Sequence, residues 1–194
     1  MAGLSDLVEL FGPPPARTAL PEDWAEVEEY VGSALPGDFK AFLDAYGPGV
    51  ICGELVVFHP RGAGALLTRM RQIHARFGAS WRSAPDAYPF RFHPAPGGLV
   101  SWGYDHSGDE HFFWPCAPEP DHWKVVTNVN GADPEIFDGT FTDFVLSFTT
   151  RLRDADPRDG LDPDALEFLE PEDLDELAAL GESAPVTPSF EPSP

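Results

Sequence analysis

Five segments of the chain carry apolar residues at intervals of three and four positions, the spacing that gathers them on one face of an α-helix. In chain order these segments are 4–11, 21–31, 36–46, 61–77 and 141–152. The last segment is the clearest, because Thr140 is placed as an N-cap, Asp143 follows three residues later, and a continuous apolar stripe runs behind them. We therefore expect five amphipathic helices.

Short runs of alternating, β-branched and aromatic residues form a second group of segments and predict β-strands. These runs are 54–58, 99–104, 110–114 and 123–129, with 135–137 as a short edge segment. Ser107-Gly108 predicts a hairpin turn, and Asn130-Gly131 predicts a second turn. Residues 79–98, rich in proline, glycine and aromatics, predict an irregular loop. This order predicts an α+β fold, with a mainly antiparallel sheet flanked by N-terminal helices, a middle helix and a C-terminal core helix.

The two ends of the chain differ from the domain predicted over residues 20–153. Residues 1–19 combine the first short helix with a proline-rich linker. Residues 154–194 form an acidic tail that is partly disordered on composition, above all over 185–194. A helix that starts near Asp162 is interrupted by Pro171, which leaves pieces too short to be stable alone.

Charge narrows the classes of partner. The formal net charge is −21, and thirteen acids against only Arg158 place −12 of it after residue 153. The electric field of so negative a protein repels nucleic acid and anionic membranes and speeds the encounter with basic proteins. The alternative explanation is that the acidic residues only keep the protein soluble. The N-terminus lacks the pattern of a signal peptide, and two distant cysteines favour a reducing cytosol. Ten arginines among twelve basic residues hint at a GC-rich bacterial genome.

Candidate chemistry concentrates at residues 104–111, where Asp, His and Glu side chains lie close together. These residue types ligate metals or supply an acid and a base, but Asp, Ser and Gly are also what a hairpin turn requires. The turn alone is the favoured interpretation, and we expect no metal and no cofactor. Gly62-Ala63-Gly64 has neither a P-loop ending nor a dinucleotide fingerprint. We expect the six arginines between 61 and 91 to pair with the protein's own carboxylates.

Several stretches resemble the SUKH superfamily, a bacterial group named partly for a yeast cell-wall assembly regulator. The most specific is LPGDFKAFLDAYG at 35–47, which is similar to the family's LP-x-D-aromatic-K-x-F-L-x-x-Y/N-G helix. The helix that carries Trp24, the run ELVVFHP at 54–60 and the hairpin 102–114 with its D-x-x-G-D turn also match in order, as does the helix 141–152. The resemblance covers about residues 20–153 and leaves out both ends.

The resemblance implies an immunity protein, a cytosolic binder that neutralises a polymorphic toxin, often a nuclease, and it supplies no catalytic residues. A toxin domain with a basic surface is then the expected partner. One alternative is a regulatory or scaffolding module in cell-envelope assembly, and another is a small metal-dependent enzyme built on the 104–111 cluster. The candidate partner-binding residues are acids of the second helix and of the hairpin, which we expect to be exposed: Glu22, Asp23, Glu26, Glu28, Glu29, Asp105, Asp109 and Glu110.

Overall fold

A computed structural model describes residues 2–14, 22–61, 65–129, 134–154 and 166–168. Its helices are α1 (Leu4–Phe11), α2 (Glu22–Val31), α3 (Gly37–Tyr46), α4 (Leu66–Ser83) and α5 (Phe141–Asp154). Its strands are β1 (Gly49–Ile51), β2 (Leu55–Val57), β3 (Val100–Asp105), β4 (Glu110–Trp114), β5 (Lys124–Thr127), β6 (Glu135–Phe137) and β7 (Leu166–Phe168). Two 3₁₀ turns lie at Pro85–Ala87 and Pro120–His122. None of these helices is long and apolar enough to cross a membrane.

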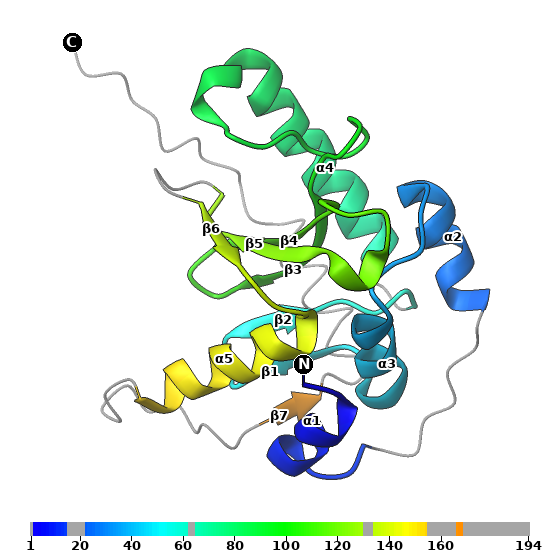
Figure 1. Cartoon of the computed structure of the whole chain (residues 1–194), viewed down its shortest axis with the longest axis vertical. Helices are drawn as coiled ribbons and strands as arrows, with labels where there is room; N and C mark the ends of the chain where they lie inside the picture. Colours follow the sequence, from blue (N-terminus) through cyan, green and yellow to red (C-terminus); the bar gives the residue numbers. More distant parts are fainter. Residues whose placement is uncertain (1, 15–21, 62–64, 130–133, 155–165, 169–194) are drawn as a thin grey trace, which may run out of the picture.

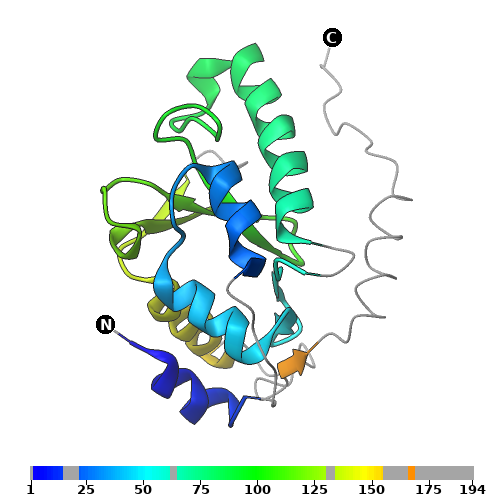
Figure 2. The same cartoon turned by 90° about the vertical axis from the view of Figure 1, so that its right-hand side faces the viewer.

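The strands form one sheet in the order β6-β5-β4-β3-β2-β1-β7, and every neighbouring pair is antiparallel. The expected α+β fold with a mainly antiparallel sheet is therefore confirmed. Helix α4 covers one face of the sheet, while α1, α3 and α5 lie on the other (Figures 1 and 2). Strand alternation explains the layers, because successive side chains of a strand point to opposite faces.

Strand β4 shows this alternation residue by residue. Phe112 packs at 5.3 Å from Phe77 of α4, whereas its neighbour Phe113 packs at 5.2 Å from Phe39 of α3. A cluster around Trp102, Phe39 and Phe141 fills the space under α3 and α5, and a smaller one lies under α4. The aromatic side chains of both clusters are almost fully buried, and each burial stabilises the fold by about 1.5–3 kcal/mol.

The helical spacing located all five helices, but α4 and the short strands differ from expectation. Helix α4 begins at Leu66 and runs to Ser83, through Gly78, into the segment expected to be irregular. A single glycine costs a helix only about 1 kcal/mol, so Gly78 does not end it. Strand β1 was not predicted, because its three residues follow Gly47-Pro48 and are too few to show a period.

The end segments also depart from the predicted limits. Leu7 of α1 is fully buried in the larger core cluster, although α1 lies before the predicted domain. Strand β7 pairs with β1 at residues 166–168, where the sequence indicated only helical pieces too short to be stable, so this strand was not predicted. This strand forms because it pairs with the edge strand β1, and the spacing of apolar residues along the chain does not report such pairing. The predicted turn at Asn130-Gly131, the Gly62–Gly64 segment and the tail 185–194 lie outside the described residues.

Candidate functional site

The β3–β4 hairpin turn is held together by Asp105. One of its carboxylate oxygens, Oδ1, accepts hydrogen bonds from the Ser107 hydroxyl and from the backbone N–H of Asp109 at 3.1 Å. Gly108 has a positive φ of 92°, a conformation that glycine adopts without strain. The prediction that this segment forms a hairpin turn is thus confirmed.

A β-bulge determines where Asp105 points. The register of β3 on β4 shifts between Ser101 and Gly103, so Trp102 is the extra residue. The shift resets the alternation of side chains, so Trp102 and Asp105 both face α5, although they are three positions apart and regular alternation would place them on opposite faces. Gly103 allows the neighbouring strand to approach, because a Cβ there would lie 2.5 Å from the Val56 carbonyl oxygen.

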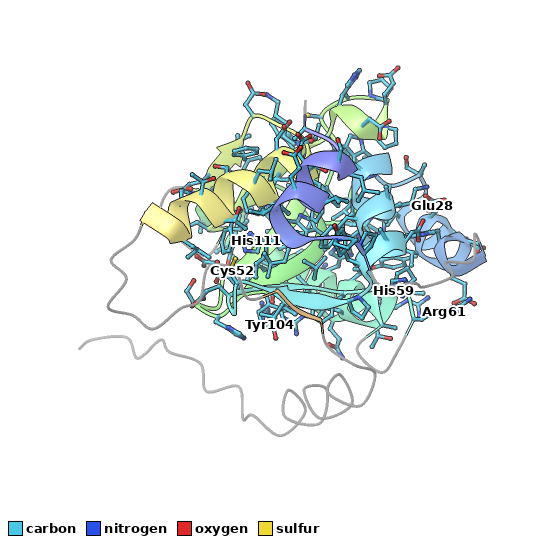
Figure 3. All side chains as sticks on the ribbon, turned by 90° about the horizontal axis from the view of Figure 1, so that it is seen from below. Glu28, Cys52, His59, Arg61, Tyr104 and His111 are labelled. Atoms are coloured by element: carbon cyan, nitrogen blue, oxygen red, sulfur yellow. The ribbon has the colours of Figure 1, made fainter. Side chains whose placement is uncertain are left out.

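His111 of β4 lies beside Asp105 on the α5 side of the sheet. Figure 3 shows His111 on that side and Tyr104 on the other. The His111 ring stacks on Trp102 at 5.3 Å and lies 5.5 Å from the Phe144 ring. Its Nε2 lies 3.3 Å from Asp105 Oδ2, the distance of an ion pair. His111 is only 2% exposed, and neither ring nitrogen makes a well-aligned hydrogen bond with a described residue.

Asp105 remains ionised in this setting. Burial alone would raise the pKa of Asp105, but contacts with His111, Ser107 and the Asp109 backbone outweigh burial and lower it to about 2. An ionised carboxylate at 3.3 Å favours the tautomer that has its proton on Nε2, the ring nitrogen that faces Asp105. The pair has the residue types of a general acid–base site. The nearby Ser107 hydroxyl bonds Asp105 instead of His111, which is not the arrangement that activates a serine nucleophile.

A pocket of about 350 Å³ opens beside the Asp105–His111 pair. Besides this pair its charged lining consists of Asp109, Glu135 of β6 and Arg151 of α5. Its apolar wall consists of the α5 side chains Phe144, Phe148 and Leu152. Glu135 and Arg151 are exposed, so the pocket lies at the surface. We refer to it below as the hairpin pocket.

Comparison with models of known protein families and with curated proteins found no match.

Glu110, expected to be an exposed acid, is buried. It is 3% exposed and faces α4, opposite the hairpin pocket. Its Oε1 accepts hydrogen bonds from Arg69 at 2.5 Å and from Arg76 at 3.1 Å. Burial raises the pKa of Glu110, while the two guanidinium groups oppose the rise. The alternation of the strand puts Glu110 on the opposite face from Asp105 and His111, so the prediction that it is exposed is wrong.

Arg69 and Arg76, two of the six arginines between 61 and 91, show the expected pairing with the protein's own carboxylates. Arg69 also lies over the Tyr104 ring at 5.1 Å, so its guanidinium is held by charge and by an aromatic face together. Other arginines of this segment lie over aromatic rings, Arg71 over Tyr30 and Arg91 over Trp81.

The acids of α2 lie away from the hairpin pocket. Helix α2 is on the opposite side of the molecule from β6 and the C-terminal end of α5 (Figure 1), and Glu28 and His111 are well separated in Figure 3. Glu26 and Glu29 are exposed, whereas Glu28 binds the Lys40 ammonium at 2.7 Å. Glu22 and Asp23 are in the first turn of α2, and their side chains lie outside the described ones. The eight candidate acids therefore do not form one surface.

Other candidate groups are dispersed. His74 is buried in α4 at 2% exposure. Cys52 is buried and Cys116 is exposed. Within the described ranges no three His, Cys, Asp or Glu side chains are grouped as metal ligands.

Sequence reasoning did not find Glu135 or Arg151 as parts of a site. Glu135 pairs with Thr127 across the β5–β6 ladder, which brings it beside the hairpin turn. The predicted turn at 130–131 already implied this return of the chain. Arg151 reaches the pocket from the last turns of α5, and only the packing of α5 on the sheet places it there.

Proposed function

We propose that this protein is an immunity-type binding protein that acts in the cytosol and neutralises a polymorphic toxin by protein–protein contact. The observation that carries the proposal is the hairpin pocket, where carboxylates and an apolar wall meet at the surface. Interfaces are anchored by a few side chains that enter such pockets, surrounded by a polar rim. The resemblance of residues 20–153 to the SUKH superfamily supports the same function.

The charge of the pocket favours a nuclease as the toxin. A nuclease presents basic side chains to the phosphates of its substrate, and a protein that occludes that surface needs carboxylates to replace them. Asp105, Asp109 and Glu135 outnumber Arg151 around the hairpin pocket. The net charge of −21 adds a long-range attraction for a basic partner.

The proposal is tested by growth rescue and by association kinetics. Co-expression with a toxin encoded beside this chain should restore growth, and the two proteins should co-purify. Replacing Asp109 and Glu135 by lysine should slow association about tenfold or more at low salt and flatten its salt dependence. Glu26→Lys with Glu29→Lys is the matched control, since it changes the net charge equally on the α2 side.

Three outcomes contradict the proposal in different parts. Equal slowing by both pairs of substitutions would leave only a general charge effect, and a larger effect of the α2 pair would move the interface to α2. Failure of rescue with every neighbouring toxin candidate would favour a regulatory module in envelope assembly.

The Asp105–His111 pair favours a small acid–base enzyme as a second candidate function. The pair lines the hairpin pocket, next to the space that a substrate would occupy. Stoichiometric zinc in the purified protein, lost together with Asp105→Asn and His111→Gln, would favour the metal-dependent form of this function. If the His111→Gln variant still rescues growth, the protein does not protect the cell by acid–base catalysis.

A further inference from the structure

We infer that the hairpin pocket is a receptor for the guanidinium of an arginine side chain presented by the partner protein. The inference rests on the proposed function for the identity of that partner, and on the pocket alone for the chemistry of the ligand. Three features of the pocket carry it: its carboxylates, the buried imidazole of His111 and the apolar wall of α5.

The carboxylates come from two separate elements that converge on the pocket. Asp105 and Asp109 belong to the hairpin turn, and Glu135 comes from the edge strand β6. Asp105 uses its Oδ1 within the turn, while its Oδ2 faces His111. Asp109 and Glu135 are the acids placed to bind a cation from outside, because the hydrogen bonds that hold the turn are accepted by the Asp105 carboxylate and not by theirs.

His111 points to a ligand independently of these acids. Its Nε2 faces Asp105 Oδ2 at 3.3 Å, and with the ring proton on that nitrogen Nδ1 is an acceptor. Nδ1 is buried and has no hydrogen-bond partner among the described residues, which costs free energy. Because His111 lines the hairpin pocket, a guanidinium that enters it brings N–H donors next to this ring.

The apolar wall suits the remainder of an arginine side chain. Phe144, Phe148 and Leu152 offer carbon surface to a three-methylene stem, which buries itself while the charged head reaches the acids. The chain's own Arg151 already lies with its guanidinium 6.0 Å from the Phe148 ring centre. The ring face therefore accepts this group, and Arg151 competes with an incoming one.

Arginine is favoured over lysine by the number and direction of its donors. A guanidinium has five N–H donors in a rigid plane and can bind two carboxylates and an imidazole nitrogen at once. An ammonium is a compact, strongly hydrated charge that does not stack on phenylalanine as well. The pocket is small for a ligand site, near the lower end of the usual range of about 300–1,000 Å³.

The test uses N-acetyl-L-arginine amide, titrated into the full chain at millimolar concentrations and followed by ¹H–¹⁵N NMR. We expect saturable shifts confined to the hairpin turn, to Thr127, Asn128 and Glu135, and to the last turns of α5. The lysine and citrulline derivatives are the matched ligands, one with charge but no fork and one with the shape but no charge. Both should bind at least about tenfold more weakly.

Variants give effects of opposite sign on the same titration. Asp109→Asn with Glu135→Gln should weaken binding about tenfold or more, since two charged acceptors are lost. Arg151→Gln should strengthen binding, because it removes a competing cation. Glu26→Gln with Glu29→Gln on the α2 side should leave binding unchanged.

Equal binding of arginine and lysine derivatives, weaker binding by Arg151→Gln, or no saturable shift at all would each overturn the inference. If the protein neutralises a toxin but does not bind the arginine derivative, the arginine inference is wrong and the proposed function stands. If the protein binds the arginine derivative but rescues growth from no toxin, the arginine site stands and the proposed function is wrong.

Discussion

His74 is the buried group whose protonation the fold opposes most directly. Its Nε2 accepts a hydrogen bond from the Ser101 backbone N–H at 2.9 Å, so the neutral ring carries its proton on Nδ1 and donates it to the Tyr30 hydroxyl, also at 2.9 Å. Burial, and to a lesser extent the nearby His93, lowers the pKa of His74 to about 3. Protonation in the folded state would break the bond to Ser101.

This geometry predicts how stability changes with pH. The unfolded chain protonates His74 below its ordinary pKa of 6.5, while the folded chain resists until about pH 3, so stability falls as the pH drops through that window. Within this window His74 lowers the free energy of unfolding by up to about 1.4 kcal/mol for each pH unit of acidification. His74→Gln keeps an acceptor without a titrating proton. Urea unfolding near pH 6 and pH 4 should therefore show a shallower loss of stability for this variant.

Identical pH slopes for wild type and His74→Gln would contradict this account. Asp105, whose pKa is lowered from 3.8 to about 2, also loses stability toward the acid end of this range, but it does so equally in both proteins and cancels in the comparison.

Single residues were predictable from the sequence where their partners are local. Asp105 forms the turn that its D-x-x-G-D pattern indicates, because its acceptors and donors lie within four residues. Glu110 was not predictable in this way, since Arg69 and Arg76 lie 41 and 34 residues before it. The burial of a charge depends on such distant partners, and spacing along the chain does not report them.

At the scale of elements, the bulge in β3 positions the candidate site. It turns Trp102 and Asp105 to the same face, and Gly103 next to it lets β2 and β3 stay paired. Helical periods were recognisable in the sequence, whereas this irregularity was not, because one extra residue does not change the composition of a strand. The three-residue strands β1 and β7 were missed for a similar reason, since they exist only through pairing.

Gly103→Ala tests the close approach at the bulge. The added methyl would meet the Val56 carbonyl oxygen, so we expect the free energy of unfolding to fall by about 1–3 kcal/mol. Gly78→Ala is the control, because a Cβ there makes only an ordinary contact with Arg82 and glycine is unfavourable inside a helix. That variant should gain about 0.5–1 kcal/mol. Chemical denaturation measures both, and a neutral Gly103→Ala would contradict the tight packing of β3 on β2.

At the scale of the whole molecule, α1 is part of the folded unit. The Ala2 backbone N–H donates to Asp143 Oδ1 at 2.7 Å, and Asp143 also binds the Thr140 N–H in the capping arrangement expected from the sequence. The Tyr46 hydroxyl donates to the Gly12 carbonyl at 2.8 Å. These bonds attach both ends of α1 to the rest of the fold, which the local pattern of residues 4–11 does not indicate.

Leu7→Ala tests this attachment. Leu7 is fully buried, so its truncation should cost about 2–5 kcal/mol of unfolding free energy in one cooperative transition. Leu4→Ala is the matched control on the same helix, because Leu4 is 37% exposed and should change stability by less than about 0.5 kcal/mol. Thermal or urea unfolding distinguishes the two. Equal, small effects would mean that α1 is an appendage, as its place outside residues 20–153 suggested.

The strand order has a consequence for how the chain reaches this state during synthesis on the ribosome. From β1 to β6, strands adjacent in the sheet are also consecutive along the chain, so the sheet can extend as each strand emerges. Helix α1 precedes all of these strands in the chain, yet Ala2 is 141 residues away from the Asp143 that holds it. Helix α1 therefore leaves the ribosome long before the residue that fixes its place.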